Sequence, residues 1–346
     1  MRRWLAAGMG ALLVACDAIV GIDHFRTCTG NECDAAPLTD VAVSDAPGSD
    51  ADAGTSCPKT IPLDAAAACN ASSPFLSPLE LVTLQDPNAA LNDQHGGTFS
   101  SDGKRFYFAR NTPAGFRIWM SELQNKVFQT ATLVSDISPL DPDASTNDFS
   151  AVESPDGMRL YFYSYRSPSP QNYGGAFFAD KTSDCKWGGA FLFADGLNQG
   201  AGPHYPVPGA IYGSYGFYLH RVSVSSNGNI DILNRVNVDA DGGSGINVPV
   251  DKAVIDVVVT PDELHLYFSS FRSAPYQLHI FESDRASTSA PWGKPYMLPQ
   301  GPGAINATDS SESKDSPHYI TPDNCTLYFT SAASGTMKLY SATRSP

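Results

Sequence analysis

Acidic and histidine side chains recur at one fixed distance before an aromatic segment that the sequence repeats. Each lies thirteen or fourteen residues before a tyrosine of that segment. These residues are Asp93, Asp148, His204 and Asp315, with Asp251 or Asp256 as the counterpart in the fourth unit. If the repeated segments surround one axis, these groups meet at one mouth of a central channel, where carboxylates and an imidazole could bind a cation or a sugar. We therefore treat Asp93, Asp148, His204 and Asp315 as candidate binding residues.

A purely structural role explains the same residues. The Asn92-Asp93 and Asn147-Asp148 pairs are typical of loops, because Asn and Asp side chains hydrogen-bond to nearby backbone groups. Loop tyrosines such as Tyr165 are equally open to two interpretations, since they could stack on a sugar or pack between strands. The sequence leaves both interpretations open, and loop capping is the simpler one for the acidic residues.

Hydrolysis of glycosidic bonds is the enzymatic alternative. This reaction needs two carboxyl groups about 5–9.5 Å apart, one of them an acid with a raised pKa. Asp93, Asp148 and Asp315 could supply the set, with Glu153 as the acid. The residues around these positions do not resemble the motifs of such enzymes. We therefore expect a noncatalytic protein and keep a glycoside hydrolase as the alternative.

Other catalytic and binding signatures are missing from the sequence. It contains no Gly-x-Ser-x-Gly elbow, and its 7 histidines show no His-x-His or His-Glu-x-x-His spacing. The balance of 36 acidic against 22 basic residues gives a net charge of −14, which disfavours nucleic acid as a partner. We expect no cofactor and no metal.

An internal repeat carries the candidate residues. Four segments have similar sequences: 100–108, 154–162, 260–268 and 321–329. Each joins a turn, typified by Ser/Thr-Pro-Asp-Gly, to an aromatic strand. The turn aspartates, expected to be structural, are Asp102, Asp156, Asp262 and Asp323. A weaker fifth copy covers 211–220 and places Tyr218 in the position of the repeated tyrosine.

The repeat predicts an all-β fold. The tyrosines recur roughly every 55 residues, a period typical of β-propeller blades. Residues 75–346 are therefore expected to form a single propeller of five four-stranded blades, with six blades as the alternative. A strand-like segment beginning at Phe75 precedes the first full repeat, and the last repeat lacks a fourth strand. We expect that N-terminal strand to close the ring.

The repeated pattern Ser/Thr-Pro-Asp-Gly-x-x-Leu-Tyr-Phe-x-Ser resembles the TolB-type, WD40-like β-propeller repeat of bacterial envelope proteins. Residues 149–166 and 260–272 match it best, including the Ser-Tyr-Arg and Ser-Phe-Arg sequences after the strand. The resemblance covers most of 90–346. It implies a platform for binding or assembly, and it is specific for the fold and not for the function.

The N-terminal residues read as an export signal. Arg2-Arg3 precedes a short apolar stretch that ends in Leu13-Val14-Ala15-Cys16, which resembles the lipobox of bacterial lipoproteins. The resemblance implies a signal peptide over 1–15 and lipidation of Cys16. The expected location is the cell envelope, with the outer membrane favoured and the protein on its periplasmic or surface face. The expected partner is an envelope protein or a glycan.

Residues 16–74 are expected to form a flexible tether. Between residues 17 and 56 the chain has eight acidic residues and one arginine, Arg26. Such a composition buries too little apolar surface to offset the entropy of the chain.

An exported chain keeps its disulfide bonds, and six cysteines are left after Cys16. They are Cys28, Cys33, Cys57, Cys69, Cys185 and Cys325. Local pairing is expected for Cys28–Cys33, and Cys57–Cys69 is the next candidate. The full connectivity stays open.

Overall fold

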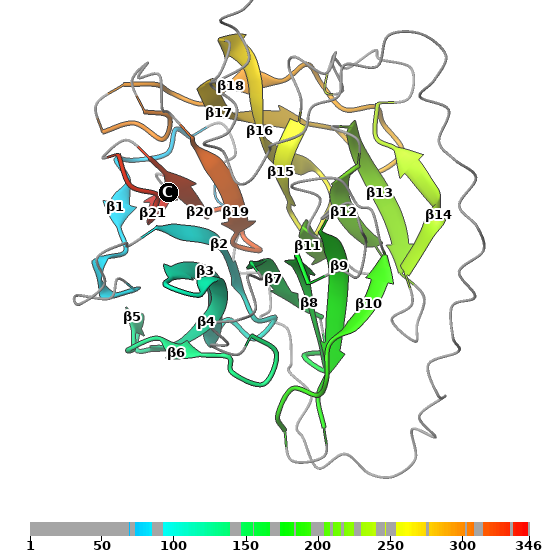
Figure 1. Ribbon diagram of the computed structural model, residues 1–346. Coiled ribbons are helices and arrows are strands. Elements are labelled where there is room, and N and C mark those ends of the chain that lie inside the picture. The colour runs from blue at the N-terminus through cyan, green and yellow to red at the C-terminus, as the bar shows by residue number, and fades with distance from the viewer. Residues whose placement is uncertain are drawn as a thin grey trace, which may run out of the picture. The chain divides into compact units, whose positions relative to one another are not determined.

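A computed structural model describes a large part of the chain (Figure 1). The described residues are 69, 73–84, 93–138, 147–154, 156–166, 174–182, 185–194, 204–207, 210–215, 218–224, 230–239, 246, 254–274, 277–301, 303–307, 314–332 and 335–344. Cys16, the acidic segment and the cysteines Cys28, Cys33 and Cys57 lie outside them. None of the helices in this part of the chain is long and apolar enough to cross a bilayer.

The described residues form β-strands and one short 3-10 helix, η2 (Val82–Leu84), as the aromatic repeats predict for an all-β fold. We number the five sheets in the order in which the repeat units that they contain follow along the chain. Sheet 1 contains β2 (Gln94–Phe99), β3 (Arg105–Thr112), β4 (Gly115–Gln124) and β5 (Val127–Phe128), and β6 (Thr132–Leu133) also pairs with β4. Sheet 2 contains β7 (Asp148–Glu153), β8 (Arg159–Ser164), β9 (Gly175–Asp180) and β10 (Phe191–Ala194).

The other three sheets have four strands each. Sheet 3 contains β11 (His204–Val207), β12 (Ala210–Tyr215), β13 (Tyr218–Val224) and β14 (Ile230–Asn237). Sheet 4 contains β15 (Val254–Val259), β16 (His265–Ala274), β17 (Gln277–Asp284) and β18 (Tyr296–Met297). Sheet 5 contains β19 (Ser316–Ile320), β20 (Thr326–Ser331), β21 (Lys338–Thr343) and β1 (Leu79–Glu80).

The sheets follow one another in a circle. Their inner strands β2, β7, β11, β15 and β19 contact one another in that order, and β19 also contacts β2. Figure 1 shows these inner strands grouped at the centre, with the later strands of each sheet farther out. This is a β-propeller-like arrangement, in which apolar residues of neighbouring sheets share a core. Tyr267 and Ile280 of sheet 4, for example, pack in one cluster with Leu327 and Phe329 of sheet 5.

The repeated turn has the same hydrogen bonds in four units. In sheet 1, the Ser100 hydroxyl donates to Asp102 Oδ1 over 2.6 Å, and the Lys104 backbone N–H donates to the same oxygen over 3.1 Å. Asp156, Asp262 and Asp323 accept the equivalent pair of bonds. Each aspartate thus fixes the turn that leads from the inner strand to the aromatic strand.

The third unit differs from the sequence prediction. Tyr212, in the second strand β12, occupies the position of the repeated tyrosine and is 1% exposed. Tyr218 lies in the third strand β13 and is 37% exposed, so its assignment to that position was wrong. The reason is a shorter connection: Val207 of β11 pairs with Ala210 of β12, so the aromatic strand begins earlier than in the other units.

The segment that begins near Cys69 completes sheet 5. Strand β1 pairs antiparallel with β21, Phe75 bridges to Arg344, and the Leu76 N–H donates to the Thr343 carbonyl over 2.8 Å. Figure 1 shows β1 beside β21, although the two come from opposite ends of the described chain. The sheet that contains the last repeat therefore takes its outer strand from the N-terminal side.

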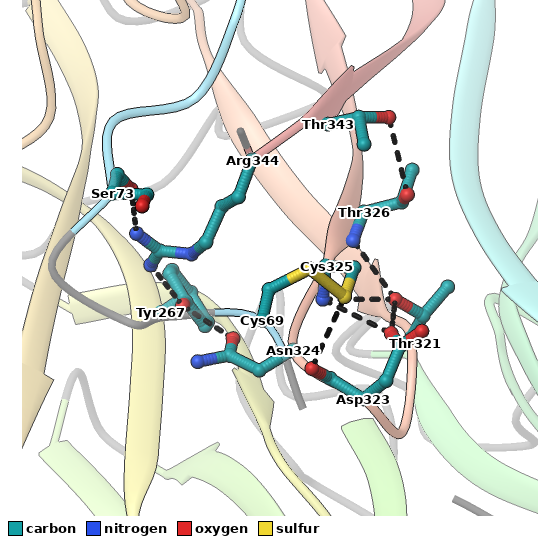
Figure 2. The surroundings of a disulfide bond; sticks show 10 residues. All are labelled: Cys69, Ser73, Tyr267, Thr321, Asp323, Asn324, Cys325, Thr326, Thr343 and Arg344. Carbon is teal, nitrogen blue, oxygen red and sulfur yellow. Dashed lines mark hydrogen bonds between the residues drawn. A yellow bond between two sulfur atoms is a disulfide. The ribbon is translucent and has the colours of Figure 1, made fainter. Parts of the chain in front are cut away.

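A disulfide bond between Cys69 and Cys325 secures this closure (Figure 2). The predicted Cys57–Cys69 pair is therefore wrong. Sequence proximity favours local pairing, but the circular fold brings residues 256 positions apart to a Cα–Cα distance of 5.2 Å. Cys185 is also disulfide-bonded.

Candidate binding site at the mouth of the ring

The candidate binding residues lie at the beginning of the inner strands. Asp148 is the first residue of β7, and Asp93 and Asp315 directly precede β2 and β19. These three therefore share one end of the ring of inner strands, which we call the mouth. His204 is the first residue of β11, but it pairs with Tyr212, whereas Asp148 pairs with Ser164, three residues beyond the repeated Tyr161. His204 thus lies level with the repeated tyrosine and not with the three carboxylates, because its predicted position was counted from Tyr218.

Asp148 is fully buried and engaged in two strong contacts. Its Oδ2 atom accepts hydrogen bonds from the Ser138 hydroxyl over 2.5 Å and from Arg166 Nη2 over 2.7 Å. Arg166 also donates to the Ile137 carbonyl over 2.7 Å. The carboxylate thus ties the loop before β7 to the end of β8.

Asp315 and Asp93 have comparable roles at two other joints. Asp315 is fully buried and accepts hydrogen bonds from the Ala307 N–H over 2.9 Å and from the Ser331 hydroxyl. Asp93 Oδ1 accepts a 3.0 Å bond from the N–H of Met337, which precedes β21 in the neighbouring sheet 5. Asp93 thus connects sheets 1 and 5, and Asp315 fastens the loop before β19.

These contacts match the loop-capping interpretation of the sequence. Within the described part of the chain, no hydrogen bond or ion pair joins any two of Asp93, Asp148 and Asp315. Both oxygens of Asp315 and the Oδ2 atom of Asp148 hold neighbouring loops, whereas Asp148 Oδ1 is buried without a hydrogen-bond partner. The contacts that these two buried residues make are those of a structural role.

Glu153 lies at the opposite end of β7 from Asp148. Five residues of a strand span about 15 Å, which exceeds the carboxyl separation that glycoside hydrolysis uses. Burial raises the pKa of Glu153, as a general acid would need, although the charges of Arg105 and Lys181 lower it. Arg105 and Lys181 contact Glu153 Oε1 at 2.9 Å and 3.2 Å and hold it in the protein interior.

A β-bulge interrupts every inner strand near the mouth, and the sequence analysis missed this feature. The pairing register shifts within β2, β7, β11, β15 and β19. In three of these strands the third residue has a positive φ: 61° at Gly96, 51° at Ser150 and 38° at Asp256. A bulge re-aims the side chain that it carries, and bulges are common beside functional sites. The signal in the sequence is only the position, third in these three strands, because the residue types differ.

His95, next to the Gly96 bulge, is the residue on which several units converge. Its ring lies edge-on to Phe116 and Phe149, with centroids 5.6 Å and 5.8 Å away. Burial lowers its pKa, whereas the charges of Asp256 and Asp93 act in the opposite direction and that of Lys314 adds to the lowering. Burial therefore favours the neutral form of the imidazole.

The charges that act on His95 come from three different parts of the ring. Asp93 precedes β2, Asp256 is the bulge residue of β15, and Lys314 precedes β19. Tyr165 extends the neighbouring aromatic group, since its ring packs edge-on against Phe149 and Tyr163. The mouth thus combines an imidazole, charges of both signs and aromatic rings.

Arginines near or just after the ends of the aromatic strands brace the same end of the ring. Arg166 and Arg272 donate to the carbonyls of Ile137 and Ile246 over 2.7 Å and 2.6 Å, and Arg110 donates to that of Leu84. These arginines also stack on aromatic rings of their own sheets, as Arg272 does over Phe268 at 4.7 Å. The Ser-Tyr-Arg and Ser-Phe-Arg sequences therefore serve to position the loops that lead into the inner strands.

Comparisons with known proteins add information on the fold. No protein-family model matches the sequence, and no curated protein matches it. TolB from Acinetobacter baumannii is similar in structure, with 11% identity, a TM-score of 0.40, and coverage of 78% of this chain and 63% of that chain. A glycosyl hydrolase from Bacteroides ovatus has 9% identity and a TM-score of 0.44, and the match covers 83% of this chain and 96% of that one. The similar structures thus include both a TolB and a glycosyl hydrolase, and the likeness concerns the fold alone.

Proposed function

We propose that this protein is a noncatalytic lipoprotein of the bacterial cell envelope, anchored through Cys16, and that the mouth of its ring binds a protein or a glycan. The outer membrane is the favoured location, with the ring on its periplasmic or surface face. The lipobox-like sequence before Cys16 supports the anchor. We also propose that each of the five sheets is one blade of a closed five-bladed propeller, which the circular contacts of the inner strands support.

The burial and hydrogen bonding of the carboxylates at the mouth are the observation that best supports a noncatalytic role. Asp148 and Asp315 are buried and bonded to the loops that they position, and Glu153 lies at the far end of β7. The same region gathers His95, Asp256 and Lys314 near aromatic rings. Mixed charge beside aromatic surface is suited to recognition, since aromatic rings contribute contact area and the charges contribute specificity.

Site-specific crosslinking tests this function in the native envelope. A photoreactive amino acid replaces Lys314 at the mouth or, as the matched control, Lys126 in the turn between β4 and β5. We expect a distinct crosslinked protein or glycan adduct from position 314 and none of the same mass from position 126. Identical adduct patterns from both positions would contradict recognition at the mouth.

An activity screen separates the alternative function. The full chain is incubated with a panel of envelope and plant glycans, and the products are analysed by chromatography. We expect no turnover. Reproducible hydrolysis that Asp148→Asn abolishes would replace the proposed function with that of a glycoside hydrolase.

A further inference from the structure

A cluster of three metal-ligating side chains lies away from the mouth, at the paired ends of β16 and β17. His265 Nδ1 is 2.6 Å from Asp284 Oδ1 and 4.0 Å from Glu282 Oε1. One potential ligand atom of each residue lies within 4.8 Å of those of the other two. Among the described residues, this is the one such group of three His, Cys, Asp or Glu side chains.

The other units with a full repeat motif carry different residues at these positions. His265 pairs with Asp284 across the strands, and its counterparts are Arg159 with Asp180 in sheet 2 and Thr326 with Thr343 in sheet 5. In sheet 2 the arginine makes a two-point ion pair with the aspartate, over 2.6 Å and 2.9 Å. An imidazole in place of the guanidinium makes a hydrogen bond to the carboxylate through Nδ1, an atom that can coordinate a metal ion when its proton is released.

Glu282 adds a carboxylate that the other units lack. It pairs with the repeated tyrosine, Tyr267, where the other sheets have Met120, Phe178 and Ser341. The other sheets form the same strand pairs without a glutamate here, so folding does not require Glu282 at this position. Among these four units, a histidine, a glutamate and an aspartate occur together at these positions only in sheet 4.

Neighbouring groups hold Glu282 in place and leave one of its oxygens available. The residue is 1% exposed, and Arg344 Nη2 donates to its Oε1 atom over 2.7 Å. The Tyr267 hydroxyl lies 2.9 Å from the same oxygen. The second oxygen, Oε2, is buried and accepts no hydrogen bond at ordinary distance, although the Tyr296 hydroxyl also acts on this carboxylate. Such an oxygen can accept a further ligand.

We propose that His265, Glu282 and Asp284 bind a divalent transition-metal ion of the Zn²⁺ type. Imidazole and carboxylate ligands in one small cluster are typical of such ions, whereas Ca²⁺ takes six to eight oxygens and Mg²⁺ strict octahedral oxygen coordination. Arg344 and Tyr267 would act as the outer groups that orient a ligand, as in many metal sites. His265 and Asp284, with side chains 19% and 44% exposed, leave the site open for the ion and for water as a further ligand.

The proposed metal site lies beside the segment that closes the ring. Arg344 joins Glu282 to the Ser73 carbonyl, over 2.7 Å at each contact, so the cluster is directly connected to the closing segment. A bound ion would link β16 and β17 beside this connection and would stabilise the closed ring. Metal binding here is independent of whatever the mouth binds.

Titration calorimetry with the full chain, purified in detergent and freed of metal by a chelator, tests the site with ZnCl₂. We expect one strong site per chain and at least a tenfold weaker affinity in each of His265→Gln and Asp284→Asn. Asp180→Asn, which changes the equivalent pair in sheet 2, is the matched control and should bind Zn²⁺ as the unchanged protein does. Affinity that is unchanged in both site variants, or no strong site in the unchanged protein, would overturn the proposal.

A second measurement uses the unchanged protein, so its result does not depend on whether the variants fold. Diethyl pyrocarbonate modifies accessible imidazole groups, and mass spectrometry of the unchanged protein reports the modified residue. We expect Zn²⁺ to protect His265 from modification by at least fivefold and Ca²⁺ to give no protection. Equal modification of His265 with and without Zn²⁺ would contradict coordination by this residue.

Discussion

The hydroxyl of Tyr267 donates a 2.7 Å hydrogen bond to Oδ1 of Asn324, a residue in the left-handed region with a φ of 56°. Asn324 stands in the turn of sheet 5 where the first two repeats have Gly103 and Gly157. Glu263 takes the same turn position in sheet 4, has a φ of 58°, and accepts a 2.5 Å bond from Tyr212 of sheet 3. Non-glycine residues in this turn therefore connect it to the repeated tyrosine of the preceding sheet.

Replacement of Asn324 should show two separable effects. Asn324→Ala removes the bond from Tyr267 and puts a Cβ-bearing residue with little tolerance for positive φ into the turn, so we expect a loss of about 2 kcal/mol in the free energy of unfolding. Asn324→Gly removes the same bond but tolerates the backbone, so its loss should be about 1 kcal/mol smaller. Urea denaturation measures both, and a glycine variant less stable than the alanine variant would contradict the strain argument.

The Cys69–Cys325 bond should contribute strongly to stability, because it closes a loop of 256 residues. In the chain-entropy description, closing a loop of this length lowers the entropy of the unfolded state by an amount worth about 5.5 kcal/mol at 25 °C. Cys69→Ser and Cys325→Ser should each lower the denaturation midpoint by a similar amount, since either change breaks the same bond. The double variant should be no less stable than either single variant, and additive losses would contradict a shared origin.

Glu263 should make stability depend on pH. Burial raises its pKa, but the hydrogen bonds from Arg221 and Tyr212 outweigh burial and hold the pKa below the ordinary value of 4.5. A carboxyl group whose pKa is lower in the folded state contributes stability above its unfolded pKa, and this contribution is lost as the pH falls through the folded pKa. Thermal melting between pH 7 and pH 3 should therefore show a smaller acid-induced loss for Glu263→Gln than for the unchanged protein. Parallel curves would contradict the linkage.

Arg166 should contribute strongly to the stability of the fold, because its removal leaves the buried Asp148 carboxylate without its cation. The Asp148 side chain is fully buried and that of Arg166 is 23% exposed, so we expect Arg166→Gln to cost about 2–4 kcal/mol. Asp148→Asn in the same chain should recover part of this loss. A double-mutant cycle by urea denaturation measures the coupling, and strictly additive losses would show that the ion pair is not the cause.

The proposed anchor predicts a change of compartment. The unchanged protein should partition with membranes and enter the detergent phase, and Cys16→Ser should move it to the soluble fraction. Cys28→Ser is the matched control and should leave the membrane association intact. Recovery of the unchanged protein in the soluble fraction would contradict lipidation at Cys16.

Much of the fold could be predicted from the sequence because the repeated turn and aromatic strand are local features. Ser100 and Asp102 show why: their hydrogen bonds stay within one turn, so residue types alone specify them. The third unit was misread because Val207 and Ala210 join β11 to β12 through a shorter connection than the motif leads one to expect. A change of loop length moves the aromatic position without leaving a motif that marks the new one.

The sequence predicted where the candidate carboxylates lie, but it did not predict which groups they contact. Regular spacing placed Asp93, Asp148 and Asp315 at the beginning of the inner strands, but their partners come from other segments, as Met337 does for Asp93. The same limitation applies to His265 and Glu282, which meet because β16 and β17 pair in register. Linear metal motifs do not describe ligands that strand pairing brings together.

The location of Cys69 determines how the protein would respond to a mechanical load. A pull on the chain from the N-terminal side reaches Cys69 before it reaches β1, whose pairing with β21 consists of two residues. The covalent bond to Cys325 passes that load directly to the turn before β20, so β1 is not peeled from the edge of sheet 5. In a reducing environment the same pull would act on the noncovalent contacts of Ser73, Phe75 and Leu76 and then on β1, and the ring would open at the joint between its two ends.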